Sequence, residues 1–449
     1  MLDLARIVKA YDIRGEVPTE LNTDVARAVG AAVVRVLDAR AVVTAHDMRE
    51  SSVPLARAFA DGATAQGADV IEAGLASTDM LYFGAGSLDL PGAMFTASHN
   101  PARYNGIKLC RAGASPVGQD TGLAEIRAMA EKGAPAYSGT PGTISQRDLL
   151  ADYAQCLRGL VDLSGIRPLK VVVDAGNGMG GHTVPTVFAG LPLELEALYF
   201  DLDGTFPNHE ANPLVPENLR DLQAAVRSHG ADLGLAFDGD ADRCFVIDEL
   251  GAPVPPSAIT ALVAVRALER DPGATIIYNL ITSHAVPEIV REHGGVPVRT
   301  RVGHSFIKAE MARTGAVFGG EHSAHYYFRD FWRADTGMLA ALHVMAALGE
   351  QDQPLSQLMA QYSRYAASGE INSTVSDAAA AAERVAKSFA DRNGVQIDHL
   401  DGLTVDLADG SWFNLRPSNT EPLLRLNVEA ADDARMAALR DEVLALVQA

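Results

Sequence analysis

Three stretches of this 449-residue chain repeat one arrangement: a short β-branched run, a loop of small residues, and a segment with apolar residues at helical spacing. They cover residues 41–63, 169–188 and 274–294. A strand that leads through a small-residue loop into an amphipathic helix is the building unit of α/β folds. Because the three units lie far apart in the chain, they predict three separate α/β domains rather than a short-period repeat.

The C-terminal part of the chain has a different pattern. Residues 377–392 have helical spacing, residues 403–417 and 422–430 read as strands around an Asp-Gly turn, and a final helical segment follows. We therefore expect the α/β fold class, with three similar α/β domains and a smaller C-terminal α+β domain. Turn-rich stretches place the four domains at residues 1–146, 147–252, 253–365 and 366–449.

Composition excludes several classes of protein. Hydrophobic residues make up 48% of the chain and charged residues 21%, and no apolar run reaches the length of a membrane helix, roughly 20 residues. The first residues lack a secretory signal, so we expect a cytoplasmic protein. A net charge of −20 repels nucleic acid and anionic membranes, which leaves a small anionic ligand as the expected partner. Cys110, Cys156 and Cys244 are odd in number and widely spaced, which argues against a disulfide framework or a zinc site.

An alternating acidic motif is the strongest chemical signal. In "LGLAFDGDADRCFVID", Asp238, Asp240 and Asp242 alternate, so in an extended loop their carboxylates project to one side and need a hard cation such as Mg²⁺. A solvated acidic turn is the plainer interpretation, but apolar runs on both sides argue against it. A calcium-binding EF-hand would need glycine where Arg243 stands. An arginine beside three aspartates also suggests a phosphate held near the metal.

Two other motifs offer different functions. Asp201, Asp203 and Thr205 in "YFDLDGTF" match the signature of haloacid-dehalogenase-type phosphatases, in which the first aspartate is the nucleophile beside a magnesium ion. That hypothesis would leave the first acidic motif without a role. Glycines in "DAGNGMGG" have the G-x-G-x-x-G spacing of a dinucleotide-binding turn, but we favour a tight strand-to-helix turn, which needs glycines for the same steric reason.

The segment "MFTASHNPARYNGIKL" places Ser98, His99 and Lys108 shortly after an apolar run. It has no nucleophile elbow, so we do not expect the serine to attack a carbonyl carbon. Adjacent side chains point apart in most backbones, so His99 is not an obvious general base for Ser98. A polar loop at the end of a strand is the alternative, and this segment alone leaves the choice open.

Four motifs taken together resemble one family. "TASHNP", "DGDADR", "GEHSAH" and "RPSNTEP" occur in the order and at the broad spacing of the α-D-phosphohexomutases, and "YDIRG" and "YNGIK" resemble the phosphomannomutase/phosphoglucomutase branch. The resemblance covers nearly the whole chain. It implies mixed sheets around a central cleft, and an isomerase that interconverts hexose 1-phosphate and hexose 6-phosphate, with mannose preferred over glucose. The reaction would run through a phosphoserine and a hexose 1,6-bisphosphate, which would also be the activator.

The resemblance also implies roles for individual residues. Ser98 would carry the phosphoryl group, and His99 and Lys108 would assist proton transfer to the sugar hydroxyl. Arg243 would position the phosphoserine or the substrate. The Mg²⁺ ligands implied are Ser98, Asp238, Asp240 and Asp242. The substrate-binding residues implied are Tyr11, Arg14, His304, Glu321, Ser323, His325, Arg416, Ser418, Asn419 and Thr420.

One departure and several alternatives accompany the resemblance. Ile281 stands where the branch often has a lysine, which would shift phosphate affinity or sugar preference. The histidines of the later motifs could be core residues, and "RPSNTEP" could be a capped turn. A magnesium-dependent phosphatase that uses Asp201 and a non-catalytic sugar-phosphate binder remain as other functions. We expect a monomer, with a dimer as the alternative, and a last domain that rotates when ligand binds.

Overall fold

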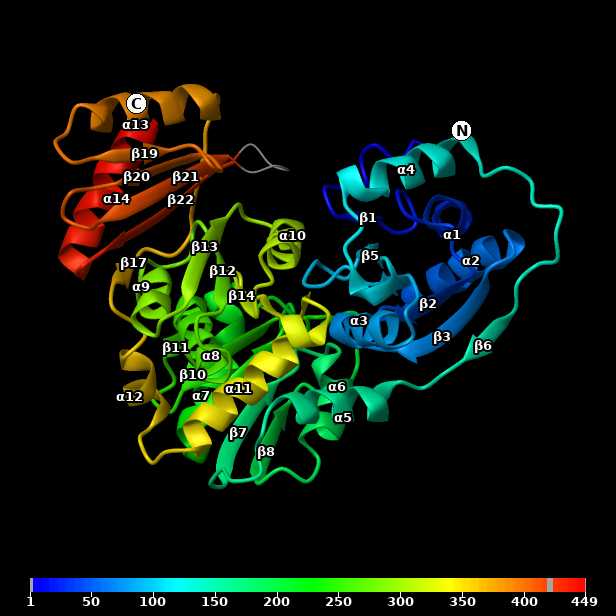
Figure 1. Cartoon of the computed structure of the whole chain (residues 1–449), viewed down its shortest axis with the longest axis horizontal. Coiled ribbons are helices and arrows are strands. Elements are labelled where there is room, and N and C mark those ends of the chain that lie inside the picture. The colour runs from blue at the N-terminus through cyan, green and yellow to red at the C-terminus, as the bar shows by residue number, and fades with distance from the viewer. Residues whose placement is uncertain (1–2, 418–422, 449) are drawn as a thin grey trace. The chain divides into compact units, whose positions relative to one another are not determined.

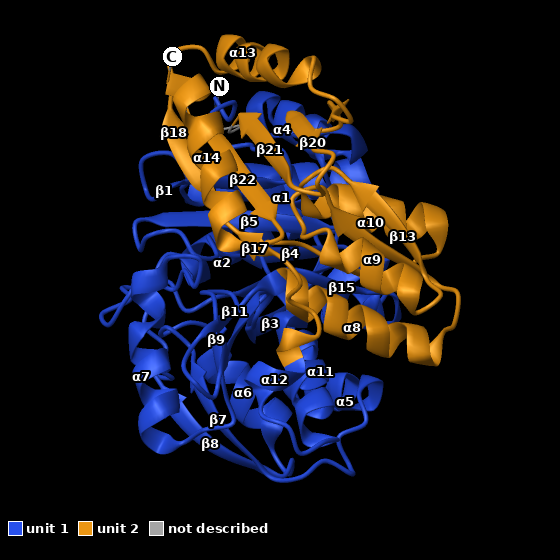
Figure 2. Cartoon of the chain, turned by 90° about the vertical axis from the view of Figure 1, so that its left-hand side faces the viewer, with its two compact units in different colours: residues 1–256, 323–358 blue, residues 257–322, 359–449 orange. Residues whose placement is uncertain are grey.

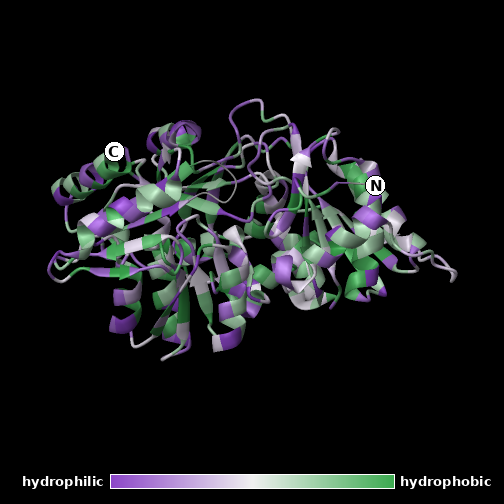
Figure 3. Cartoon of the chain, turned by 90° about the horizontal axis from the view of Figure 1, so that it is seen from above, coloured by the Kyte–Doolittle hydropathy of each residue, from purple (hydrophilic) through white to green (hydrophobic). Residues whose placement is uncertain are grey.

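The structure is a computed structural model that describes residues 3–417 and 423–448 (Figure 1). The chain divides into two compact units, residues 1–256 with 323–358, and residues 257–322 with 359–449 (Figure 2). Hydrophobic residues lie along the strands, and hydrophilic residues lie on loops and outer helix turns (Figure 3). Within the described ranges, no helix combines the length and the apolar character needed to cross a membrane.

The first unit begins with a six-stranded mixed sheet in the order β1-β5-β4-β2-β3-β6. Strands β3 and β4 run parallel to β2, whereas β5 runs antiparallel to β4 and β1. The strands are β1 (Asp12–Glu16), β2 (Ala41–His46), β3 (Asp69–Leu75), β4 (Gly92–Phe95), β5 (Tyr104–Cys110) and β6 (Ile144–Gln146). The helices are α1 (Thr23–Leu37), α2 (Ser52–Ala65), α3 (Thr78–Ser87) and α4 (Leu123–Lys132), with the short 3₁₀ turns η1 (Ala112–Ala114) and η2 (Gln119–Thr121).

A second mixed sheet, in the order β11-β10-β9-β7-β8, follows in the same unit. Strand β7 pairs in parallel with β8 and β9, and β9 pairs antiparallel with β10. The strands are β7 (Leu169–Asp174), β8 (Leu193–Leu198), β9 (Leu233–Phe237), β10 (Cys244–Asp248) and β11 (Pro253–Val254). The helices are α5 (Leu150–Leu160), α6 (Gly180–Phe188) and α7 (Arg220–His229), with the 3₁₀ turn η3 (Pro216–Leu219).

The first unit is completed by residues from much later in the chain. A hairpin of β15 (Tyr326–Phe328), the 3₁₀ turn η4 (Arg329–Phe331) and β16 (Ala334–Asp335) leads into α11 (Gly337–Gly349). Twelve of the thirteen residues of α11 are buried, and the helix contacts β10 and α5. A helix that is apolar on all sides needs cover on all sides. The last helix that begins in this unit is α12 (Leu355–Ala360).

The second unit contains three parallel strands and an antiparallel sheet. Strand β12 (Thr275–Asn279) pairs with β13 (Val296–Thr300) and β14 (Phe318–Gly320), and the helices here are α8 (Pro256–Arg270), α9 (Ala285–Glu292) and α10 (His304–Thr314). The antiparallel sheet contains β17 (Ala366–Ala367), β18 (Ile371–Thr374), β19 (Gln396–Asp398), β20 (Leu403–Asp406), β21 (Trp412–Pro417) and β22 (Leu423–Ala430). Helices α13 (Ala378–Ala390) and α14 (Asp433–Gln448) share its hydrophobic core.

The sequence-based prediction of fold class is confirmed. The three predicted strand–helix units are β2 with α2, β7 with α6 and β12 with α9, and the C-terminal segments form strands and helices as expected. The predicted mixed character of the sheets is also present. It arises because β5 and β10 each return antiparallel to the preceding strand of a parallel core.

Candidate active site

Ser98 lies in the loop between β4 and β5 and is 4% exposed. Its Oγ donates to Oδ2 of Asp238 at 2.7 Å, although the two residues belong to different sheets. Its backbone N–H donates to Oγ1 of Thr96, and its φ of 51° is in the left-handed region. The structure therefore brings the serine of the first sheet to the acidic loop of the second.

The geometry at His99 differs from the expectation that its side chain points away from Ser98. Its Nδ1 lies 3.2 Å from Ser98 Oγ because the left-handed backbone at Ser98 turns both side chains to the same side. Nη2 of Arg243 donates to the same Nδ1 at 2.6 Å, so the ring proton belongs on Nε2. Burial, with the nearby cations Arg243 and Arg14, holds the pKa of His99 well below its usual range. The imidazole is therefore neutral in this arrangement.

The acidic loop between β9 and β10 gathers the three aspartates. One oxygen from each of Asp238, Asp240 and Asp242 lies within 4.8 Å of the others, and all three residues are buried. The loop is a turn rather than the extended segment expected, because Ala241 has a φ of 57° and its N–H donates to the carbonyl of Asp238. The carboxylates converge by this turn and not by alternation along an extended backbone.

Cations and hydroxyls surround the aspartates. Nζ of Lys108 lies 2.7 Å from Oδ2 of Asp240 and 2.6 Å from Oδ2 of Asp242. Arg243 donates from Nε and Nη2 to Oδ2 of Asp238, and Thr78 Oγ1 donates to Oδ2 of Asp240. Among the described residues, the buried Oδ1 atoms of Asp240 and Asp242 accept no hydrogen bond. Two buried carboxylate oxygens of this kind, next to Asp238, suit a hard divalent cation such as Mg²⁺.

The protonation of this cluster follows from burial and charge together. Burial penalises every charge here, but the ion pair and hydrogen bond with Lys108 lower the pKa of Asp240. Burial also works against the ammonium, yet Asp240 and Asp242 raise the pKa of Lys108 well above its usual value. Burial raises the pKa of Asp238, although Arg243 attracts its charged form. The lysine and Asp240 are therefore a charged pair.

The "GEHSAH" segment is divided between the two units. In the first unit, His325 Nε2 lies 3.8 Å from Oδ1 of Asp242 and its Nδ1 lies 3.0 Å from Ser323 Oγ. In the second unit, Glu321 is buried and accepts from Nδ2 of Asn279 and from the N–H of Gly303. The hydrogen bonds from Asn279 and Gly303 orient the Glu321 carboxylate as an acceptor.

The remaining predicted residues are spread over both units. In the first unit, Arg14 on β1 donates to Asn100 Oδ1 and Asp12 Oδ2, both at 2.6 Å. Tyr11 is the residue directly before β1. In the second unit, His304 begins α10, Ile281 is buried after β12, and Arg416 lies on β21 with 9% exposure. Ser418, Asn419 and Thr420 lie outside the described residues.

The second acidic motif forms a surface loop after β8. Asp201 is exposed, and its backbone carbonyl accepts a hydrogen bond from Asn177. Oδ1 of Asp203 accepts from the N–H and Oγ1 of Thr205. Among the described residues, neither aspartate belongs to a group of ligands close enough to hold a metal. The carboxylate of Asp203 therefore closes a turn.

The glycine-rich turn after β7 has a packing role. A Cβ on Gly178 would lie 2.7 Å from the carbonyl of Gly239, and the N–H of Met179 donates to that carbonyl. The absence of a side chain at Gly178 lets this turn lie against the acidic loop. This contact agrees with the tight-turn interpretation of the glycine spacing.

Sequence reasoning missed two buried polar groups near the site. Arg49 donates to the Ser98 carbonyl, and its position directly after a strand, in "HDMRESS", is the signal that could have identified it. Asp79 accepts from Ser77, Tyr153 and Thr336, and it follows Thr78, which donates to Asp240. No local signal in the sequence distinguishes Asp79 from an ordinary residue in the first turn of a helix.

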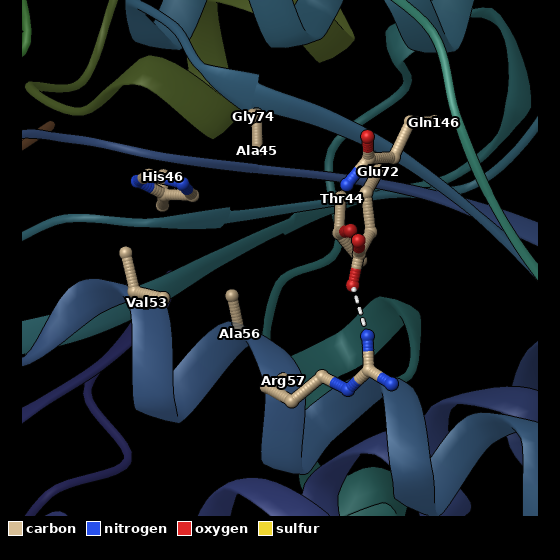
Figure 4. A pocket seen from close by; sticks show the side chains of 9 residues that line it. All are labelled: Thr44, Ala45, His46, Val53, Ala56, Arg57, Glu72, Gly74 and Gln146. Atoms are coloured by element: carbon tan, nitrogen blue, oxygen red, sulfur yellow. Dashed lines mark hydrogen bonds and ion pairs between the residues drawn. The ribbon is translucent and has the colours of Figure 1, made fainter.

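A separate cavity of about 250 Å³ lies between strands β2 and β3 and helix α2 (Figure 4). Arg57 and Glu72 form an ion pair on its wall, with an N···O distance of 3.4 Å. The residues that line it are Thr44, Ala45, His46, Val53, Ala56, Arg57, Glu72, Gly74 and Gln146. Because these described residues include none of the predicted site residues, we place the cavity outside the candidate active site.

Comparison with known proteins identifies the family. The chain matches phosphoglucomutase/phosphomannomutase α/β/α domains I, II and III over residues 5–136, 151–251 and 255–365, and the C-terminal domain over residues 370–446. These matches define an enzyme of the phosphohexomutase class. The chain belongs to the phosphoglucomutase/phosphomannomutase family.

Individual relatives are similar over almost their whole length. The chain is 43% identical over 438 residues to phosphohexose mutases of Xanthomonas campestris pv. campestris, with 97% of each chain covered. It is 42% identical over 452 residues to a phosphomannomutase of Escherichia coli, with 98% of each covered. A crystal structure of a phosphoglucomutase/phosphomannomutase family protein from Burkholderia thailandensis is similar with a TM-score of 0.90 and 34% identity, covering 100% of this chain and 98% of that one.

Proposed function

We propose that the protein interconverts hexose 1-phosphate and hexose 6-phosphate through a phosphoserine at Ser98 and a hexose 1,6-bisphosphate intermediate. The observation that carries this proposal is the 2.7 Å distance between Ser98 Oγ and Asp238 in a buried cluster that also holds Lys108 and Arg243. A hydroxyl surrounded by carboxylates and cations suits phosphoryl transfer, in which catalysis is mainly positioning and charge neutralisation.

The proposed reaction has two transfers. In the first, the bond between phosphorus and Ser98 Oγ breaks and phosphorus forms a bond to a sugar hydroxyl oxygen. The hydroxyl proton passes to a nearby base, and the departing Ser98 Oγ takes up a proton and becomes a hydroxyl again. In the second, Ser98 Oγ loses its proton and bonds to the other phosphorus of the bisphosphate, the bond from that phosphorus to the sugar oxygen breaks, and the sugar oxygen takes up a proton. Lys108 and Arg243 balance the charge of the phosphoryl oxygens. The low pKa of His99 keeps its imidazole neutral, so a proton that the ring takes up from the sugar hydroxyl would be passed on rather than kept.

The acidic loop fits a magnesium ion. Asp238, Asp240 and Asp242, with an oxygen of phosphorylated Ser98, would hold it, as the convergence of the three carboxylates supports. When bound, the ion supplies charge neutralisation for the transferring group. Lys108 supplies part of that neutralisation in its absence, because it contacts two of the same carboxylates.

We assign substrate recognition to the residues outside this cluster. Glu321 and Ser323 would bind ring hydroxyls, since the carboxylate of Glu321 is already oriented as an acceptor. The nonreacting phosphate would bind Arg416 and the three residues Ser418 to Thr420. Tyr11, Arg14, His304 and His325 complete the proposed substrate site. The relatives named phosphomannomutase support mannose as the preferred sugar and glucose as the second.

A coupled assay with mannose 1-phosphate and glucose 1-phosphate, each with and without a hexose 1,6-bisphosphate activator, tests the proposal. We expect Mg²⁺-dependent isomerisation, phosphate on Ser98 by mass spectrometry, and complete loss of both in Ser98→Ala. The matched variant Asp201→Asn should keep wild-type turnover. Free phosphate as the only product, lost in Asp201→Asn and kept in Ser98→Ala, would show a phosphatase. Binding without turnover or phosphoserine would show a silent sugar-phosphate binder.

A further inference from the structure

Arg49 is a buried cation that the proposed chemistry does not use. It lies between β2 and α2 and is 2% exposed. A guanidinium has five N–H donors, and here all of them have partners. Nη2 donates to the carbonyls of Ser98 and Asn100 at 2.9 and 2.7 Å, Nη1 donates to those of Pro101 and Tyr104 at 3.0 Å, and Nε donates to Asp47 Oδ2 at 3.2 Å.

Three of these five contacts hold the loop that carries Ser98, and a fourth holds Tyr104 at the start of β5. The loop connects β4 to β5 without regular secondary structure, so its carbonyls need partners from elsewhere in the protein. Ser98 itself has a φ of 51°, a conformation that costs energy for a residue other than glycine and persists only where surrounding contacts impose it. The same conformation turns Oγ toward Asp238 and His99.

The Ser98 carbonyl is held from two sides. Arg49 Nη2 donates to it on one side, and a Cβ on Gly239 of the acidic loop would lie only 2.4 Å from it on the other. The position of the serine backbone is thus set jointly by Arg49 and by the loop that carries the aspartates. A shift in the guanidinium would change the distance between Ser98 Oγ and Asp238 Oδ2.

Neighbouring residues fix Arg49 in turn. Asp47 Oδ1 accepts from the Arg49 N–H and from Ser52 Oγ, which anchors the start of α2. The "DLDGTF" loop covers the guanidinium, because the Phe206 ring centroid lies 5.1 Å from its central carbon. A Cβ on Gly204 would lie 2.7 Å from Arg49 Cα, so this loop packs directly on the Arg49 backbone.

We propose that Arg49 is a positioning residue for phosphoryl transfer, which holds Ser98 Oγ against the acidic loop through three carbonyls of the loop that carries Ser98 and one at the start of β5. The inference rests on the proposed phosphoserine function. It also gives the "DLDGTF" loop a purpose: Gly204 and Phe206 cover the arginine, and the carboxylates of that loop take no part. Lysine cannot replace Arg49, because an ammonium has three donors and no planar fork.

Arg49→Lys tests the inference, with Arg158→Lys as the matched control. Arg158 also donates to a backbone carbonyl, that of Ala189, at the surface. For mannose 1-phosphate we expect kcat of Arg49→Lys to fall by about 100-fold while KM changes by less than about threefold, because the reacting oxygen is displaced but the sugar contacts remain. Arg158→Lys should match the wild type. An unchanged kcat for Arg49→Lys, or equal changes in kcat and KM, overturns the inference.

A second variant covers the outcome in which Arg49→Lys does not fold. Phe206→Leu keeps the guanidinium and removes its aromatic cover, so we expect kcat to fall by about 10-fold at constant KM, because the reacting oxygen is displaced less than in Arg49→Lys. Hydrogen exchange of residues 98–104 should become faster in this variant, with the rest of the first sheet unchanged. Unchanged exchange and kcat count against the inference. A wild-type protein without isomerase activity or phosphoserine instead refutes the proposed function.

Discussion

Two loops of the second sheet carry an Asp-x-Asp sequence, and they differ in almost every physical respect. The loop of Asp238 and Asp240 follows β9, a fully buried strand in the middle of the sheet. The loop of Asp201 and Asp203 follows β8, the edge strand, whose central residues are exposed. Of the two loops, both described by the structure, the first alone contributes to a group of at least three ligands close enough to hold a metal. In this protein, the position of the preceding strand in the sheet, more than the Asp-x-Asp spacing, distinguishes the loop that can hold a metal ion.

The two loops also differ in how the charges of their carboxylates are stabilised. Asp240 depends on a partly buried lysine on β5 and a buried threonine at the start of α3. Asp203 depends on its own neighbour, because hydrogen bonds from Thr205 lower its pKa. The first arrangement couples distant segments, whereas the second is local and solvated.

Substitution of one aspartate in each loop should give the largest difference. Asp240→Asn removes a proposed metal ligand and one partner of Lys108, so we expect kcat/KM to fall by more than about 100-fold, beyond the usual effect of losing an outer-sphere group. Asp203→Asn should keep wild-type activity within about twofold, because its carboxylate only closes a surface turn. Steady-state kinetics at several Mg²⁺ concentrations measure both. Equal losses of kcat/KM in Asp240→Asn and Asp203→Asn would contradict the distinction between the two loops.

Removal of Lys108 should show how much this lysine stabilises the two buried carboxylates that it contacts. In Lys108→Met, Asp240 and Asp242 lose their shared cation, and we expect the free energy of unfolding to fall by about 3 kcal/mol without metal. Mg²⁺ should then raise the unfolding temperature more than it does in the wild type. Thermal unfolding with and without Mg²⁺ measures this, and Lys170→Met, at an exposed pair with Glu194, is the control. An identical Mg²⁺ effect in all three proteins contradicts the prediction.

Asp79 should give the first unit a pH dependence of stability. Burial raises its pKa to about 6, so the folded state binds more protons than the unfolded state between about pH 4 and that value. The stabilisation from this group is therefore complete at the acid end of the window and falls by about 3 kcal/mol as pH rises through it. Urea unfolding across the window should show a flatter profile for Asp79→Asn. A profile as steep as that of the wild type would contradict the assignment.

Asp203 should show the smallest effect, with the opposite sign. Hydrogen bonds from Thr205 lower its pKa, so its contribution is present above about pH 4 and is lost as pH falls through the folded value. Asp203→Ala should lower the unfolding midpoint slightly at neutral pH and converge on the wild type in acid. Thermal melts between neutral pH and about pH 3.5 test the trend. A difference that grows in acid would refute it.

The sequence predicted features that depend on local pattern. The strand–helix units, the strands on either side of the acidic loop and the C-terminal sheet all follow from periodicity and turn residues. The contact between Ser98 and His99 could not be predicted, because it depends on a left-handed backbone that distant contacts impose. The contacts of Arg49 and Asp79 join segments far apart in the chain, so no local pattern reports them. The domain boundaries after residues 146, 252 and 365 stay predictions.

The order in which the chain builds the first unit has a consequence for its synthesis. The unit uses residues up to 256, then receives residues 323–358 after an excursion into the second unit. Thr336 of the returning segment donates to Asp79, and α11 contacts β10 beside the acidic loop. On the ribosome, both reactive loops therefore emerge well before α11, which packs on β10. A nascent chain of this protein must keep apolar surface shielded, by chaperones or by the ribosome itself, until about residue 358 has been made.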